Sequence, residues 1–136
     1  MREVRDIAVF HSSRFKPILP DACQVGPRTY GAELAFWLAG KLAKQGVVTS
    51  YPVAADTGWM LSFAAAGGTV FQVLCANVDG SDTHWRLSLA CDSPSLDAAR
   101  DLVNAIRFVV HAAVPRADID WRYRDAPAGQ QALPSL

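Results

Sequence analysis

The chain has 136 residues, of which 51% are hydrophobic and 19% are charged. This composition is typical of one globular domain and excludes wholesale disorder. Thirteen Lys and Arg residues balance thirteen Asp and Glu residues. Because a neutral chain has no general positive field, this balance disfavours nucleic acid and an anionic membrane as partners.

The first residues carry charges on both sides of Val4, a pattern typical of neither a signal peptide nor a membrane span. The three cysteines, Cys23, Cys75 and Cys91, lack the close spacing of a metal site or a disulfide framework. An odd number of dispersed cysteines favours a reducing compartment, with Cys75 and Cys91 as small buried apolar side chains. We therefore expect a cytoplasmic protein with no metal and no cofactor.

The N-terminal part predicts a strand followed by a long loop. Residues 4–10 form a β-branched and aromatic run, which is typical of a strand. Residues 11–28 show no periodicity and are interrupted by three prolines and a glycine. A loop of this length in a compact domain is either functional or poorly ordered, so residues 11–28 are the first place to expect a site.

An amphipathic helix is predicted from Thr29 to Gly46. Thr29 can cap its N-terminus, Glu33 lies in the first turn, and Gly46 supplies a left-handed residue that ends it. Apolar side chains recur at three- and four-residue spacing along one face, namely Tyr30, Leu34, Trp37, Leu38 and Leu42.

Four consecutive strands with short turns follow, at residues 47–53, 59–64, 69–78 and 84–91. Alternation is clearest in the last of these, and Pro52 indicates an edge or a bulge in the first. Consecutive strands joined by short turns predict an antiparallel meander.

The C-terminal part predicts a second helix at residues 93–113, with Ser93 as its N-cap and Pro115 as its stop. Residues 119–124 alternate and predict a final edge strand with a charged outer face. Residues 1–124 thus form one domain, and residues 125–136 form a tail with little to bury.

The predicted fold class is α+β: a meandering antiparallel β-sheet of five or six strands, in the order β-α-β-β-β-β-α-β, with two helices packed on one face. The other face is left open. It carries a mixture of polar and apolar side chains, namely Met60, Ser62, Gln72, His84, Arg86 and Ser88. This mixture favours a binding surface or a dimer interface over a core.

No motif of an established catalytic or metal site is present. Cys23 with His11 or His84 would make a conceivable nucleophile and base, but such a pair is defined by geometry. Trp59 follows an Asp-Thr-Gly turn and is either a partner-binding anchor or, as we favour, the first core residue of its strand. Trp85 and Arg86 are adjacent, so they point to opposite faces.

The combination of Glu33 and Trp37-Leu38 on a helix, Pro52 in the next strand, and an Asp56-x-Gly58-Trp59 turn resembles a pattern in small uncharacterised bacterial α+β proteins. The resemblance covers residues 29–63, departs from that pattern at Thr57, and implies no activity. The element order also resembles TATA-binding-protein-like and helix-grip arrangements, which bind nucleic acids, small ligands and proteins alike.

These observations favour a non-enzymatic protein-binding domain of the inhibitor, immunity or adaptor type, which contacts another protein through the open sheet face and the 11–28 loop. The alternative is a small-ligand or enzymatic pocket between that loop and the sheet. A homodimer is a third possibility. The candidate binding residues are His11, Arg14, Cys23, Asp56, Trp59, His84 and Arg86.

Overall fold

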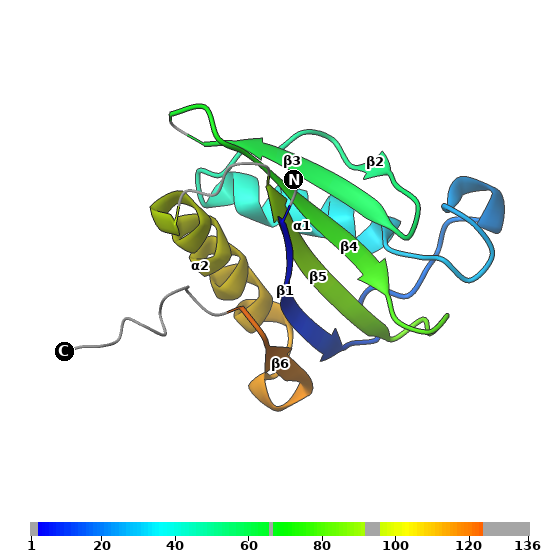
Figure 1. Cartoon of the computed structure of the whole chain (residues 1–136). Coiled ribbons are helices and arrows are strands. Elements are labelled where there is room, and N and C mark those ends of the chain that lie inside the picture. The colour runs from blue at the N-terminus through cyan, green and yellow to red at the C-terminus, as the bar shows by residue number, and fades with distance from the viewer. Residues whose placement is uncertain (1–2, 66, 92–95, 124–136) are drawn as a thin grey trace.

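One six-stranded antiparallel sheet with both helices on one face organises residues 3–65, 67–91 and 96–123, which the computed structural model describes (Figure 1). This confirms the predicted α+β class. The elements are β1 (Glu3–His11), the 3-10 turn η1 (Asp21–Cys23), α1 (Ala32–Lys44), β2 (Val53–Ala54), β3 (Trp59–Ala64), β4 (Val70–Asn77), β5 (His84–Cys91), α2 (Leu96–Ala113), η2 (Arg116–Asp118) and β6 (Ile119–Trp121).

The sheet order is β2-β3-β4-β5-β1-β6, so the predicted meander runs through four neighbouring strands and β1 lies between β5 and β6. Alternation places one side of each strand against the helices. In β4 and β5, Val73 pairs with Leu89 and Cys75 with Leu87, and all four side chains are buried. The sheet therefore forms one wall of the core.

A β-bulge in β1 provides a hydrogen-bond acceptor for the residues that follow β6. The register between β1 and β5 shifts between Asp6 and Ala8, which leaves Ile7 as the extra residue. The Ile7 side chain is fully buried, and its carbonyl accepts hydrogen bonds from the backbone N–H groups of Arg122 and Tyr123. The bulge thus holds the chain that leaves β6, and β6 lies at the sheet edge, as predicted.

The start of α1 differs from the prediction. The helix begins after Gly31, and Thr29 does not cap it, because the Thr29 hydroxyl donates to the carbonyl of Pro27 instead. Gly31 has a φ of 144°, and a Cβ on it would lie 2.4 Å from the carbonyl oxygen of Cys75. Only glycine, which has no Cβ, fits this close to β4. The position of Gly31 therefore determines that α1 begins at the next residue. The predicted end is confirmed, since Gly46 has a φ of 84°.

The strand predicted at residues 47–53 is wrong for most of its length. Only Val53 and Ala54 pair with β3. Before them, Ser50 holds the chain to β3: its N–H donates to the carbonyl of Ser62, while its hydroxyl accepts from the N–H of Ser62. A serine side chain here replaces part of the backbone ladder, which ends the regular pairing.

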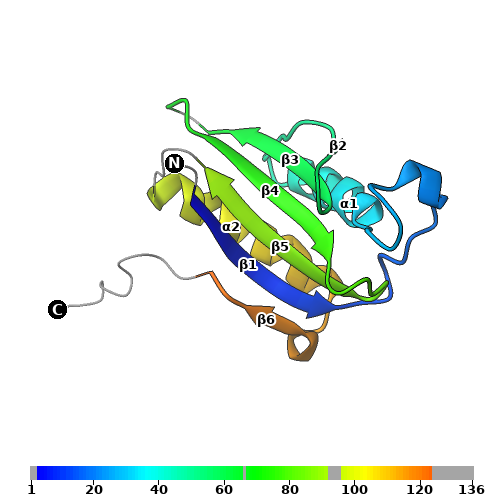
Figure 2. The same ribbon diagram turned by 45° about the vertical axis from the view of Figure 1, so that its right-hand side comes forward.

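The helical layer closes the core from the other side, as Figure 2 shows with the sheet in front of both helices. The second helix buries apolar side chains that recur at three- and four-residue spacing, namely Ala99, Val103, Ile106 and Val110. The predicted cap at Ser93 and the tail at 125–136 lie outside the described residues. Within the described ranges, no helix has the length and apolar character needed to cross a membrane.

Candidate functional site

The open face of the sheet is the surface that brings together most of the predicted site residues. Cross-strand pairs place Met60 beside Leu74 and Leu74 beside Ser88, all on the side away from the helices. Ser62, Gln72, Ala90 and Arg86 follow the same alternation. No described element covers this face (Figure 2).

One half of the open face is polar and centred on Asp6. Its carboxylate accepts a hydrogen bond from the Ser88 hydroxyl at 3.1 Å. The same carboxylate lies 3.6 Å from the Arg122 guanidinium and 4.0 Å from that of Arg86. Arg122 also pairs with Asp120 at 3.0 Å. The two arginines of this half are therefore balanced by two carboxylates.

The other half contains a shallow hollow of about 230 Å³. Its lining is mainly apolar and comes from β1, β3, β4, β5 and the turn before β3, namely Val4, Ala55, Asp56, Thr57, Met60, Gln72, Leu74, Ser88 and Ala90. Val4 is 61% exposed. The predicted site residue Asp56 thus lies at the rim of this hollow, and Ser88 links the hollow to the Asp6 cluster.

His11 and His84 meet at the end of the open face, where β1 and β5 pair. Their rings stack with centroids 4.0 Å apart. Burial lowers the pKa of His84, and the charges of His11, Arg86 and Arg122 lower it further, while Asp79 acts in the opposite direction. The sequence singled out both histidines, but not their contact.

Two other predicted site residues lie elsewhere. Trp59 faces the helices and packs against Phe36 with centroids 6.5 Å apart, which supports the structural role that we favoured for it. Cys23 is exposed in η1, and no contact among the described residues joins its thiol to either His11 or His84. The hypothetical cysteine-histidine pair thus has no geometric support.

The 11–28 loop is held in place by two residues whose role the sequence did not reveal. Phe15 is 2% exposed and packs against Phe10, Trp37 and Trp85. One oxygen of Glu33, in the first turn of α1, accepts the backbone N–H groups of residues 18 and 19, each at 3.0 Å. In the sequence, the one sign that this loop is anchored to the core is an aromatic residue, Phe15, within an otherwise aperiodic segment.

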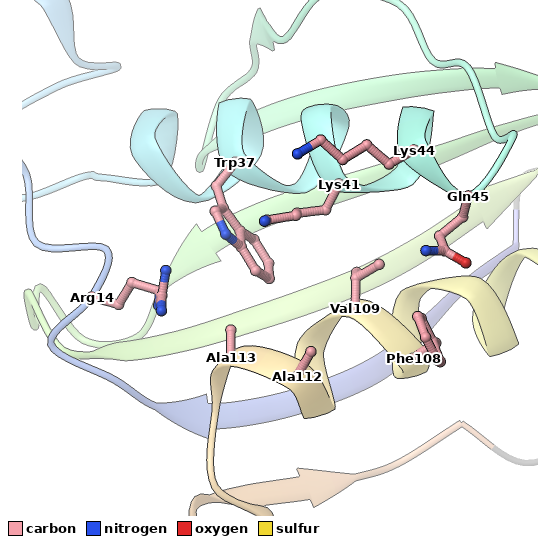
Figure 3. A pocket seen from close by; sticks show the side chains of 9 residues that line it. All are labelled: Arg14, Trp37, Lys41, Lys44, Gln45, Phe108, Val109, Ala112 and Ala113. Atoms are coloured by element: carbon pink, nitrogen blue, oxygen red, sulfur yellow. The ribbon is translucent and has the colours of Figure 1, made fainter.

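Arg14, the last predicted site residue, lies on the helix side of the molecule. It lines a pocket between α1 and α2 together with Trp37 and Lys41 (Figure 3). The loop therefore begins at the open face and crosses to the opposite layer within three residues of His11.

The cysteines behave as the sequence predicted in the core. Cys75 and Cys91 are buried, and burial raises the pKa of the Cys75 thiol far above its ordinary value, which makes that thiol unreactive. Across the part of the chain that the structure describes, no group of three or more His, Cys, Asp or Glu side chains is arranged to hold a metal ion. Comparisons of the chain with models of protein families, with curated proteins and with solved structures found no match.

Proposed function

We propose that this protein is a binding domain whose partner is another protein, and that the open sheet face is its contact surface. The observation that carries the proposal is the make-up of that face. An apolar hollow at Val4, Met60 and Leu74 adjoins a cluster of paired charges around Asp6. An apolar patch bordered by polar groups is typical of protein–protein contact sites.

The charges on this face favour a protein over a nucleic acid. Arg86 and Arg122 both lie near Asp6, and Arg122 also pairs with Asp120. A nucleic-acid interface needs cations that are available to phosphate groups along a continuous surface. Arginines that are already paired with carboxylates are more typical of a protein interface, where complementary charges fix the relative position of the two partners.

The 11–28 loop, which leaves the end of β1 and is held against α1, is the second part of the proposed contact surface. Glu33 fixes the backbone at Ile18 and Leu19, and the Ile18 side chain is 85% exposed. An exposed aliphatic side chain on a fixed backbone loses little conformational freedom when a partner covers it. Ile18 is thus a suitable secondary contact.

The pocket alternative has less support, because Phe15 fills the space between the loop and the sheet. An inhibitor, immunity or adaptor role in the cytoplasm fits the binding proposal, since such proteins act through surface contacts and need no catalytic group. A partner protein would then cover the face that the fold leaves open.

The test is purification of the tagged protein from its own cells, followed by mass spectrometry and light scattering. Three variants probe the surface: Met60→Lys in the hollow, Arg86→Ala in the charged cluster, and Ile18→Ser in the loop. Asn104→Ala, an exposed position on α2, is the matched control on the opposite layer. Urea unfolding of each variant shows whether the fold is kept.

A stoichiometric partner that the control retains, and that the Met60 and Arg86 variants lose without loss of stability, would support the proposal. A partner retained by every variant would contradict the assignment of this face. A clean monomer or homodimer with no other protein bound would contradict the binding role itself.

A further inference from the structure

The helix side of the molecule carries a second candidate site, a pocket of about 260 Å³ between α1 and α2. The chain brings three segments together there: the start of the 11–28 loop, one face of α1 and the last turns of α2. The lining residues are Arg14, Trp37, Lys41, Lys44, Gln45, Phe108, Val109, Ala112 and Ala113 (Figure 3).

The pocket is strongly positive although the chain as a whole is neutral. Arg14, Lys41 and Lys44 line it, and no Asp or Glu does. None of these three side chains makes an ion pair or a hydrogen bond with any other described residue. Cations that converge without a carboxylate repel one another and raise the local affinity for an anion.

The geometry favours an anion near the Trp37 end of the pocket. Figure 3 shows Arg14 reaching from the loop toward the Trp37 ring, while the Lys41 side chain extends along α1 toward the same ring. Trp37 is itself fixed against buried Phe15, with ring centroids 4.9 Å apart. A guanidinium binds carboxylate or phosphate through paired hydrogen bonds, and a lysine adds a mobile point charge.

The α2 side of the pocket is apolar. Phe108 is 62% exposed, an unusual position for a phenylalanine on a helix surface, and Val109, Ala112 and Ala113 continue the same wall. Small alanine side chains leave room above the helix, and Phe108 limits the pocket beyond them. This wall can cover the hydrocarbon part of a ligand whose charged end lies beside the basic residues.

We propose that this pocket binds a small organic anion, with its carboxylate or phosphate beside Arg14 and Lys41 and its apolar part on the α2 wall. The volume is slightly below the range of about 300–1,000 Å³ that is usual for drug-sized ligands, so the ligand is small. This site lies on the layer opposite the open face and does not depend on the proposed function.

The test is a titration followed by two-dimensional NMR of the full chain, because its four tryptophan indoles report on four places at once. Phenyl phosphate and hexanoate are the two anionic probes, and inorganic phosphate and hexanol test each half of the ligand alone. We expect a saturable shift of the Trp37 indole signal with the anionic probes. The indoles of Trp59, Trp85 and Trp121 are internal controls. A Trp37→Phe variant assigns the signal.

Variants then test separately how the basic side chains and the free space of the pocket contribute to ligand binding. Arg14→Ala and Lys41→Ala should each weaken binding of the preferred probe by tenfold or more, and Ala112→Phe should block the pocket without removing a charge. Lys16→Ala, at an exposed lysine of the same loop outside the pocket, is the matched control and should bind as the parent chain does.

Phenyl phosphate and hexanoate distinguish a phosphate ligand from a carboxylate ligand, and either preference supports the site. The proposal would be overturned if neither probe shifted the Trp37 indole at millimolar concentration. Equal binding of hexanol, or unchanged binding to both the Arg14 and Lys41 variants, would contradict the role of the basic residues. A response to inorganic phosphate as strong as that to phenyl phosphate would contradict the role of the apolar wall.

Discussion

The imidazole rings of His11 and His84 lie 14° from parallel with their centroids 4.0 Å apart, at the position where the last residue of β1 pairs with the first residue of β5. Two neutral rings can stack in this way, whereas two protonated rings would repel. The pair closes the end of the open face and stands where the 11–28 loop begins. Its protonation state therefore matters for the stability of this corner.

The free energy of unfolding should fall as the pH drops below about 6.5, the ordinary pKa of histidine. The pKa of folded His84 is lowered, and the pKa of His111 is lowered too, by burial and by the charges of Arg116 and Arg107. Between the lowered and the ordinary pKa, the unfolded chain binds more protons than the folded chain, so stability rises with pH in that window.

Urea unfolding between about pH 8 and pH 5 measures this slope. His84→Asn and His111→Asn should each make the slope shallower, and the double variant should remove most of the contribution from histidine. An equally steep slope in the double variant would show that other groups control the acid response.

Glu33→Ala should release the loop. The variant removes the acceptor of the Ile18 and Leu19 N–H groups, and because these groups are exposed and water can replace it, we expect a loss of about 0.5–1.5 kcal/mol of stability. Amide hydrogen exchange should become faster at residues 16–24 and stay unchanged in β4 and β5. Glu33→Gln keeps an acceptor oxygen and should recover part of the protection. Unchanged exchange in the alanine variant would mean that Phe15 alone holds the loop.

Phe15→Ala should lower the free energy of unfolding more than Glu33→Ala does, although Phe15 lies in no helix or strand. Phe15 packs edge-on against Phe10 and Trp85, so its removal leaves a cavity under the loop. We expect a loss of about 3–5 kcal/mol in urea unfolding, the range of large-to-small changes in a core. Tyr51→Ala is the control: that side chain is 86% exposed, and its loss should cost less than about 0.5 kcal/mol.

Two glycines that approach the same carbonyl should not tolerate alanine. A Cβ on Gly31 or on Gly58 would lie 2.4 Å from the carbonyl oxygen of Cys75 in β4. Gly58→Ala should cost about 1–3 kcal/mol, because the backbone must move to admit the methyl group. Gly31→Ala carries in addition the strain of its positive φ.

Gly40→Ala is the matched control for this pair. Gly40 lies inside α1 with open space around it, so alanine there should raise stability by about 0.5–1 kcal/mol through its helix propensity. Stable Gly31 and Gly58 variants would show that α1 and the turn before β3 are less closely packed on β4 than the structure has them.

Local patterns in the sequence predicted most of the helices and strands and the face that each of them buries, with residues 47–53 as the main exception. Alternation in β5 separated buried Trp85 from exposed Arg86, and the 3.6-residue spacing in α1 marked the buried face that includes Leu34 and Leu38. These patterns are local, because a side chain's direction depends on the period of its own segment. The open face could be described for the same reason before its strands were placed beside one another.

The contacts between segments far apart in the sequence became known from the folded structure. It placed β1 between β5 and β6, stacked His11 on His84, and placed Arg14 and Lys41 in the lining of one pocket. No local period encodes such contacts, since they depend on strand pairing and on the path of an aperiodic loop. Phe15 and Glu33 set that path: they lie 18 residues apart in the chain and together hold the loop against the core.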